Sequence, residues 1–149
     1  MNTCFGPVPL RITYHAPCHL RAQGVGDAPL ELLRQVPGLE IREIRDSCCG
    51  IAGTFGMKHQ NFDLAMRMGA PLFQEIRRAQ VEKVLSGCGT CKIQIEQGTG
   101  VETWHPIRIL RDAYRAGEPN PPSFALPEGE RRGRRREEPC FSPRSDREP

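Results

Sequence analysis

Residues 81–104, VEKVLSGCGTCKIQIEQGTGVETW, decide the fold class of this 149-residue chain. The run 81–85 is rich in Val and Leu and predicts a β-strand, and the stretch SGCGTC after it turns into a helix that continues through Glu96. Gly98 or Gly100 ends that helix, and residues 101–104 predict the next strand. A strand, a helix and a strand in close succession are typical of a parallel crossover unit.

The same alternation extends through the rest of the chain. Strands are expected over residues 10–14 (LRITY) and 39–44 (LEIREI), with a loop over residues 15–27. Further helices are expected after Asp27, over residues 60–78, where Pro71 kinks or splits the helix, and after His105. The predicted fold is therefore α/β: a mostly parallel, four-stranded, Rossmann-like sheet with helices on both faces. The strand order stays open.

The domain organisation follows from a change in composition near Gly117. We expect an N-terminal lead-in over residues 1–9, a folded domain over residues 10–116 and a disordered tail over residues 117–149. The tail holds seven of the 14 prolines and few apolar residues, so it cannot bury enough surface to offset its ordering entropy. The arginine-rich run 131–136 is expected to be a solvated patch.

Composition excludes several classes of protein. The net charge is only +3 and aromatic residues are few, which argues against a nucleic-acid partner. No apolar run approaches the roughly 18 residues of a membrane-spanning helix. The first ten residues lack the pattern of a secretory signal, so we expect a cytoplasmic protein whose seven cysteines stay reduced.

Five of the seven cysteines follow predicted strands. Cys18 comes after the first strand, Cys48 and Cys49 come after the second, and Cys88 and Cys91 come after the third. Because the carboxyl ends of parallel strands share one edge of the sheet, we expect these thiols to meet there. Cys4 and Cys140 lie in the lead-in and the tail and are poor candidates for ligands.

Thiolates are soft ligands that favour zinc, copper(I) or iron–sulfur clusters. Gly50, Gly53 and Gly56 let the backbone fold closely around a bulky group. Adjacent side chains normally point apart, so Cys48 and Cys49 are poorly placed to chelate one metal ion together. They could contact two metals of a larger cluster, which favours a polynuclear centre over a single zinc ion.

Three alternatives remain open. The cysteines could simply be buried as small apolar side chains. Four thiols, or a mixture of cysteine and histidine, could bind zinc in a structural or interaction module. Cys88 and Cys91 also form a C-x-x-C pair, as in thiol–disulfide oxidoreductases.

Histidines and lysines near these cysteines have two interpretations each. His15, His19 and His105 could donate to sulfur or carry protons, and they could equally be loop or capping residues. Lys58 and Lys92 could offset the negative charge of a cluster, or be ordinary solvated lysines. No nucleophile–base pair stands out, so no catalytic residue is predicted.

Four motifs together resemble the cysteine-rich domain known as the CCG domain. They are YHAPCHLRAQG (14–24), DSCCGIAGTFGMK (46–58), GCGTCKIQIEQGTG (87–100) and WHPIRIL (104–110). The resemblance covers nearly all of residues 10–116. It extends to the C subunit of anaerobic glycerol-3-phosphate dehydrogenase, to the iron–sulfur part of FAD-linked lactate/glycolate-type oxidases and, more distantly, to the B subunit of heterodisulfide reductase.

The resemblance implies that Cys18, Cys48, Cys49, Cys88 and Cys91 hold a [4Fe-4S]-type cluster, which is noncubane in heterodisulfide reductase. It also implies a non-catalytic electron-transfer subunit of an oxidoreductase complex. Such a subunit takes electrons from a flavin-dependent dehydrogenase subunit and passes them toward the quinone pool, beside a sibling iron–sulfur subunit. Its location would be cytoplasmic and peripheral on the inner membrane face through its partners.

The chain departs from this family in two ways. Relatives usually carry a ferredoxin-like module and two CCG domains, whereas this sequence contains one CCG domain and no such module. We therefore expect it to correspond to the C-terminal piece of such a subunit. The arginine-rich tail is not part of the family pattern.

Overall fold

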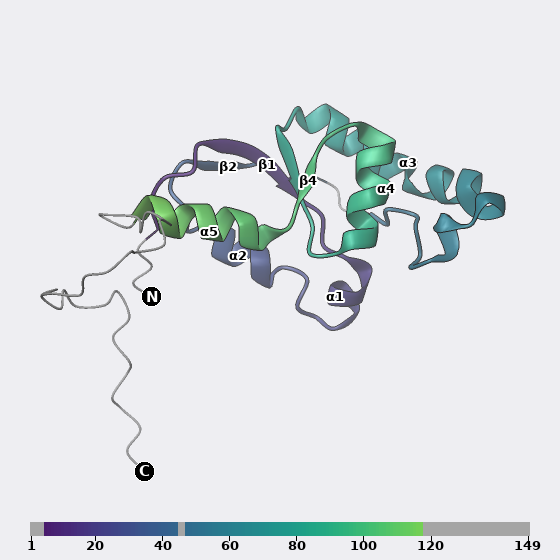
Figure 1. Cartoon of the computed structure of the whole chain (residues 1–149), viewed down its shortest axis with the longest axis horizontal. Coiled ribbons are helices and arrows are strands. Elements are labelled where there is room, and N and C mark those ends of the chain that lie inside the picture. The colour runs from purple at the N-terminus through teal and green to yellow at the C-terminus, as the bar shows by residue number, and fades with distance from the viewer. Residues whose placement is uncertain (1–4, 45–46, 118–149) are drawn as a thin grey trace, which may run out of the picture.

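Four parallel strands form the sheet in a computed structural model that describes residues 5–44 and 47–117 (Figure 1). The strand order is β2–β1–β3–β4, so the chain starts in the middle of the sheet and adds strands on both sides. The strands are β1 (Leu10–Tyr14), β2 (Leu39–Ile41), β3 (Lys83–Leu85) and β4 (Thr103–Trp104). All three pairings are parallel, which confirms the predicted fold class.

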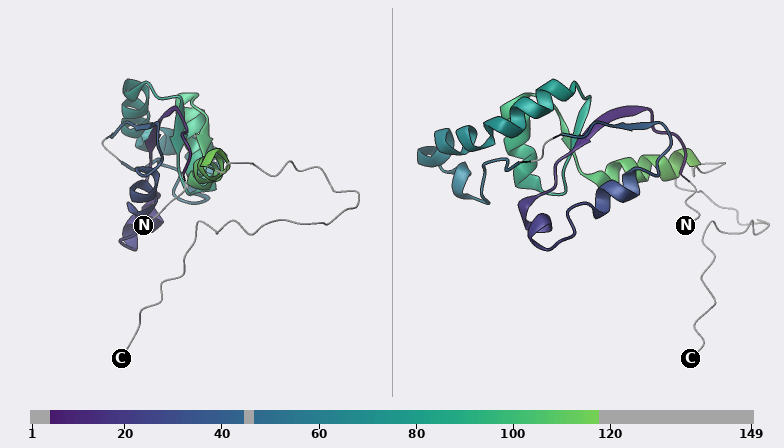
Figure 2. Two further views of the ribbon diagram at one scale, coloured as in Figure 1. Left: turned by 90° about the vertical axis from the view of Figure 1, so that its left-hand side faces the viewer. Right: turned by 180° about the vertical axis from the view of Figure 1, so that it is seen from behind.

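Helices cover both faces of this sheet, as predicted. Helices α3 and α4 pack together on one face, and α2 and α5 lie side by side on the other (Figures 1 and 2). The helices are α1 (Cys18–Ala22), α2 (Ala28–Leu33), α3 (Phe62–Ala79), α4 (Gly89–Thr99) and α5 (Pro106–Gly117), with 3-10 turns at Phe55–Met57 and His59–Asn61.

Local sequence signals explain several helix boundaries. Asp27 immediately precedes α2, and Pro29 lies in its first turn, where a missing N–H costs nothing. Gly100 ends α4 in the left-handed conformation with φ +75°, and its N–H bonds the Glu96 carbonyl. Pro106 begins α5.

Three details differ from the prediction. The strand expected over 39–44 ends at Ile41, and the Thr13 hydroxyl donates to the Arg42 carbonyl just beyond it, at 2.8 Å. Residues expected as a loop include α1, a single turn too short to show helical periodicity. Helix α3 continues through Pro71, which lies on its exposed side, where water can satisfy the carbonyl that proline leaves unbonded.

Side chains alternate along the strands and divide the core between the two faces. On β1 and β3, Ile12, Tyr14 and Leu85 join the cluster beneath α2 and α5, together with Leu33 and Ile109. The opposite cluster, beneath α3 and α4, consists of Cys49, Ile51, Leu72, Phe73, Ile76, Val84, Cys91 and Ile95. Two of the predicted ligand cysteines are therefore part of the hydrophobic core.

Residues 5–9, which the sequence predicts as a loose lead-in, pack against the folded domain. The Phe5 ring meets the Tyr114 ring edge to face at 4.8 Å, and the Gly6 N–H donates to the Ala113 carbonyl at 2.8 Å.

The predicted tail, the arginine-rich run 131–136 and the cysteines at 4 and 140 lie outside the described residues. Among residues 5–44 and 47–117, none of the helices combines the length and apolar character that a membrane span requires.

The two isoleucines of α5 provide a matched test of this packing. Ile109 is fully buried and Ile107 is 61% exposed. Ile109→Ala leaves a cavity and is expected to lower the free energy of unfolding by about 2–5 kcal/mol. Ile107→Ala is expected to change it by less than about 0.5 kcal/mol, as measured by urea denaturation. Equal effects of the two substitutions would contradict this packing.

Candidate metal centre

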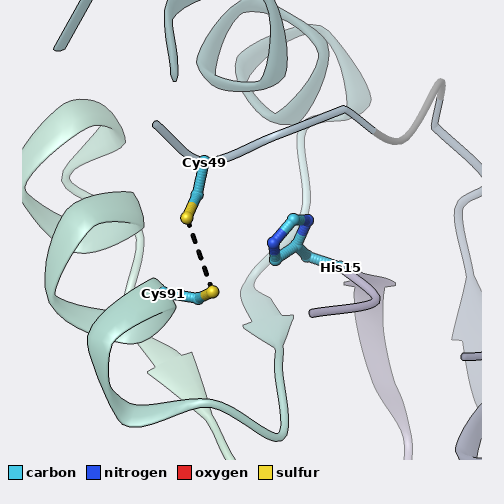
Figure 3. A group of neighbouring side chains, drawn as sticks. All are labelled: His15, Cys49 and Cys91. Carbon is cyan, nitrogen blue, oxygen red and sulfur yellow. Dashed lines mark hydrogen bonds between the residues drawn. The ribbon is translucent and has the colours of Figure 1, made fainter. Parts of the chain in front are cut away.

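Two buried thiols and a buried imidazole meet beneath α4 (Figure 3). The sulfur atoms of Cys49 and Cys91 lie 3.4 Å apart, although the residues are 42 positions apart in the chain. The ligand atoms of His15, Cys49 and Cys91 all lie within 4.8 Å of one another. Both cysteines are 3% exposed and His15 is 1% exposed.

Each of these residues follows a different strand. His15 comes directly after β1, and its backbone N–H donates to the Leu85 carbonyl at 2.9 Å, which continues the ladder beyond the strand. Cys91 lies in the first turn of α4, shortly after β3. Cys49 lies in the connection from β2 to α3. The predicted convergence at the carboxyl edge is thus observed for Cys49 and Cys91.

A close backbone contact holds Cys49 in place. Gly50 has φ +88°, and a Cβ atom there would lie 2.1 Å from the Ala65 carbonyl oxygen of α3. Gly69, one turn along α3, is equally tight, because a Cβ atom there would lie 2.4 Å from the Cys49 carbonyl oxygen. Only glycine at these two positions lets the loop lie against the helix.

The pKa values of the two buried thiols are shifted in opposite directions. The hydrogen bond with Cys91 and, to a smaller extent, the contact with His15 lower the pKa of Cys49 to about 4, against the effect of burial. The hydrogen bond to Cys49, followed by burial, raises the pKa of Cys91. Without a metal the pair therefore shares one proton across the 3.4 Å sulfur contact.

Cys88 and Cys48 lie nearer to solvent. Burial alone would raise the pKa of Cys88, but the Thr90 hydroxyl, 3.2 Å from its sulfur, and the Cys91 backbone and thiol lower it. Cys48 is exposed, and its sulfur accepts the Gly50 N–H at 3.3 Å. The contacts of Cys88 favour its thiolate form.

Cys18 is the first residue of α1 and is exposed. Together with Cys48 and Cys88 it lies outside the group of ligand atoms that the described part of the chain brings within 4.8 Å. The structure therefore brings Cys49 and Cys91 together. Cys18, Cys48 and Cys88 follow their strands at the same edge of the sheet without joining that group.

His15 is one of the three histidines that sequence reasoning left undecided. It follows Thr13 by two positions, so the two side chains share a sheet face where the ladder continues beyond β1. His105 is a capping residue, whose Nδ1 accepts the Ile107 N–H at 3.2 Å. His105 and His19 line a separate, largely apolar pocket of about 540 Å³ next to α2 and α5.

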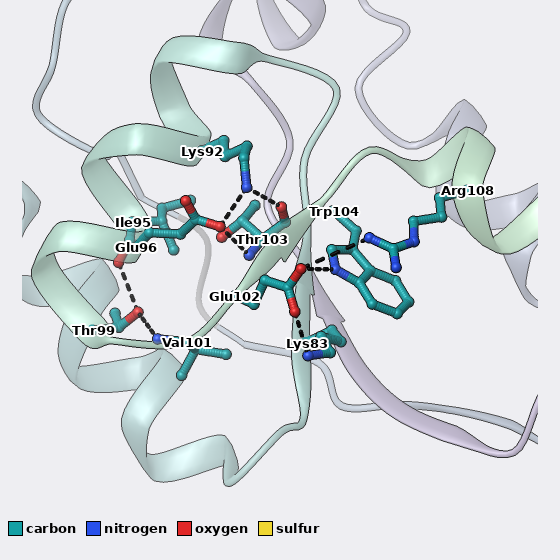
Figure 4. Close-up of polar contacts among 10 residues, drawn as sticks. All are labelled: Lys83, Lys92, Ile95, Glu96, Thr99, Val101, Glu102, Thr103, Trp104 and Arg108. Carbon is teal, nitrogen blue, oxygen red and sulfur yellow. Dashed lines mark hydrogen bonds and ion pairs between the residues drawn. The ribbon is translucent and has the colours of Figure 1, made fainter.

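Lys92 stabilises the packing of α4 on β4 (Figure 4). Its ammonium group pairs with Glu96 and donates to the Thr103 carbonyl at 2.8 Å, while the Thr103 N–H donates to Glu96 at 2.8 Å. Burial alone would raise the pKa of Glu96, but Lys92 and the Thr103 N–H hold it below its ordinary value. Lys58 is exposed.

A second set of polar side chains holds the edge strand β4 in place (Figure 4). The Trp104 indole N–H donates to Glu102 at 2.6 Å, and the Arg108 guanidinium lies 3.5 Å from the centre of the indole ring. Lys83 of β3 pairs with Glu102 at 2.6 Å. These contacts tie β3, β4 and the start of α5 together, and so fix the strand that precedes Cys91.

The donor set fits a thiophilic metal centre. Two thiols and an imidazole converge in the core, and thiolates and imidazole are ligands for zinc and iron. The Ser47 and Ser86 hydroxyls, close in sequence to Cys48 and Cys88, are buried and have no hydrogen-bond partner among the described residues. Such buried polar atoms are rare in the absence of a ligand or water.

These features define an α/β domain with a buried thiol centre at the carboxyl edge of a parallel sheet. The family model for the cysteine-rich domain (CCG) matches residues 12–96, which is more than half of the chain. The chain belongs to the CCG cysteine-rich domain family. The resemblance drawn from the four sequence motifs is confirmed.

Three curated relatives illustrate the family. The C subunit of the anaerobic glycerol-3-phosphate dehydrogenase of Escherichia coli K12 is 45% identical over 107 residues, which cover 72% of this chain and 27% of the relative. An iron-sulfur protein of Methanocaldococcus jannaschii is 37% identical over 92 residues, covering 61% and 18%. The D subunit of the dihydromethanophenazine:CoB–CoM heterodisulfide reductase of Methanosarcina barkeri is 36% identical over 98 residues, covering 62% and 24%. The chain thus spans about a quarter or less of these relatives.

Gly50 and Gly53, in the loop that contains Cys49, provide a matched test of the contact between this loop and α3. Gly50→Ala combines a strained φ with a clash against the α3 backbone, so it is expected to lower the free energy of unfolding by more than about 2 kcal/mol. Gly53 also has positive φ (+66°), but a Cβ atom there meets nothing within 4 Å. Gly53→Ala is expected to cost about 1 kcal/mol. Urea denaturation of the metal-free chain measures both, and equal losses would contradict the contact.

Proposed function

We propose that the chain is the iron–sulfur cluster-binding, electron-transfer part of a respiratory-type dehydrogenase. One observation carries the proposal: two thiols, one from the loop before α3 and one from α4, are buried 3.4 Å apart beside a buried histidine. A reduced thiol pair of this kind in the core of a domain is typical of a metal centre. The family relation supports it, since one relative is named an iron-sulfur protein.

The cluster in this proposal is of the [4Fe-4S] type, and the resemblance to heterodisulfide reductase favours a noncubane form. Its ligands would be Cys18, Cys48, Cys49, Cys88 and Cys91. Such a cluster supplies one-electron oxidation and reduction. Five thiols exceed the four ligands of a structural zinc ion, which favours a cluster.

The chain's own residues would set the environment of that centre. Cys49 and Cys91 provide a water-poor side, because both lie within the cluster of apolar side chains beneath α3 and α4. Cys48 and Cys18 provide the exposed side, toward which a partner could approach. Burial on one side and access on the other suit a centre that exchanges electrons and excludes water.

The partner in this proposal is a flavin-dependent dehydrogenase subunit that supplies the electrons. A sibling iron–sulfur subunit and the quinone pool would lie downstream, which places the complex in the cytoplasm at the inner face of the membrane. Relatives named as subunits of a dehydrogenase and of a heterodisulfide reductase support assembly with other subunits.

The zinc and thiol-redox alternatives each have one supporting observation. The His15–Cys49–Cys91 group is also a set of zinc ligands. The Cys91 sulfur lies 3.4 Å from that of Cys49, so these two residues, as well as Cys88 and Cys91, are a candidate disulfide pair. Metal analysis distinguishes all three functions.

Anaerobic purification of the chain tests the cluster. We expect a brown protein with about four irons and matching sulfide per chain. Cys49→Ser and Cys91→Ser each remove a buried ligand and are expected to abolish the visible absorbance. Cys4→Ser and Cys140→Ser are the controls and are expected to retain it. Iron and sulfide quantitation provide the measurement.

Other outcomes of the same experiment favour the alternatives. A colourless protein with one zinc per chain indicates a structural module. A metal-free protein whose activity requires Cys91 indicates a thiol oxidoreductase. Full iron content in Cys49→Ser would show that the ligand assignment is wrong.

Electron exchange is tested on the iron-loaded chain. After reduction with dithionite and removal of the excess, menadione, a soluble quinone, is expected to restore the absorbance of the oxidised form within the mixing time of a stopped-flow instrument. Zinc-loaded chain is the control and should show no change. An iron-loaded chain that dithionite cannot reduce would argue against an electron-transfer role.

A further inference from the structure

Two buried hydrogen-bond donors, one directly after β3 and one in α4, have no partner among the described residues. They are the Ser86 hydroxyl and the Gln94 side-chain amide nitrogen. Ser86 is 3% exposed and Gln94 is 2% exposed, so bulk water does not satisfy them. A buried donor left unpaired costs about 1–3 kcal/mol, which makes a missing acceptor the simplest explanation.

The sheet places Ser86 on the face that carries the thiols. Val84 belongs to the cluster that contains Cys49 and Cys91, and Leu85 belongs to the opposite cluster. The Ser86 N–H still bonds the Trp104 carbonyl at 2.9 Å, so the strand geometry continues through it and its side chain shares the face of Val84.

The register then places Ser86 beside His15. Tyr14 pairs with Leu85, and the His15 N–H bonds the Leu85 carbonyl at 2.9 Å, so His15 and Ser86 are neighbours on adjacent strands. Neighbouring strands lie about 4.8 Å apart. A ring nitrogen of His15 lies within 4.8 Å of both buried sulfurs (Figure 3). As the neighbour of His15 on the adjacent strand, Ser86 therefore approaches the same centre from the sheet side.

Helix α4 places Gln94 near the same centre from the helix side, opposite the sheet. Gln94 follows Cys91 by three positions, so the two side chains leave the helix about 60° apart and one turn from each other. Lys92 and Glu96, on the other side of α4, bond Thr103 of β4. Gln94 therefore points away from β4, and Gly98, near the same side of α4, packs against Phe73 of α3.

We propose that Ser86 and Gln94 donate hydrogen bonds to sulfur atoms of the cluster and raise its midpoint potential. The inference rests on the proposed function. Sulfur in a thiol is a weak acceptor, but thiolate and sulfide are anionic, and hydrogen bonds to anions are the stronger ones. Each donor stabilises the reduced cluster more than the oxidised one, because the reduced cluster carries one more negative charge.

Redox titration of the iron-loaded, full-length chain tests this inference. Ser86→Ala and Gln94→Met remove the donors with little change in shape, and both variants are expected to keep their iron and shift the midpoint potential to more negative values. Ser86→Thr retains a hydroxyl and is expected to keep the potential of the unaltered chain. Visible absorbance follows the titration, and iron analysis reports loading.

Thr13→Val is the matched control. Thr13 is a buried residue on the same sheet face, two positions before His15, but its hydroxyl already bonds the Arg42 carbonyl. Loss of this hydroxyl is expected to lower the free energy of unfolding and to leave the midpoint potential of the cluster unchanged. A shift as large as that of Ser86→Ala would show a general effect of a weakened fold and would overturn the inference.

The remaining outcomes separate the inference from the proposed function. If the unaltered chain binds no iron, both fail. If Ser86→Ala and Gln94→Met load fully and titrate like the unaltered chain, only the inference fails. Loss of iron in Ser86→Ala but not in Ser86→Thr supports a role of the hydroxyl at the centre, whereas loss in both would overturn it.

Discussion

The close contact of the Gly50 loop with α3 is the constraint on which the rest of the centre depends. Cys49 reaches Cys91 only because its own carbonyl and the following residue lie directly on the backbone of α3, at Ala65 and Gly69. Helix α3 in turn packs on α4, which carries Cys91. The thiol contact of 3.4 Å is therefore set by the glycine contact between the Cys49 loop and α3, and by the packing of α3 on α4 through side chains such as Phe73.

This packing also explains why two thiols that repel each other as anions can share the core. The two sulfurs share one proton: their hydrogen bond and the contact with His15 lower the pKa of Cys49, and the same hydrogen bond raises the pKa of Cys91. A cation bound here would replace that proton and neutralise both sulfurs. The buried pair is thus better suited to a metal than to two neutral thiols, which would gain little from meeting in the core.

Much of the architecture was predictable from local patterns. Alternating apolar residues in 10–14, the Gly100 end of α4 and Pro106 at the start of α5 all appear where expected. The strand order β2–β1–β3–β4 was not predictable from the sequence. It depends on which faces of the helices pack together, and no local sequence pattern indicates that. The short helix α1 was missed for a different reason: five residues show no helical period.

The candidate centre was predictable in position and less so in detail. Parallel topology alone indicates that residues after the strands share an edge, and Cys49 and Cys91 do meet there. Sequence could not rank the five cysteines by burial, since that ranking comes from the packing of α3 and α4. Nor could it select His15 from three histidines, because a histidine that caps a helix, such as His105, has the same local sequence context.

The difference between Cys48 and Cys49 bears on the type of metal centre. These adjacent residues were expected to point apart, and Cys49 is buried whereas Cys48 is exposed and accepts the Gly50 N–H. A single zinc ion at the buried site would use Cys49, Cys91 and His15, and would leave Cys48, Cys88 and Cys18 without a role. An extended cluster can contact thiols on both its buried and its exposed side. Because Cys48 and Cys49 point apart, they cannot both bind one metal ion, but both can contact an extended cluster. Their geometry therefore favours a polynuclear centre over a mononuclear one.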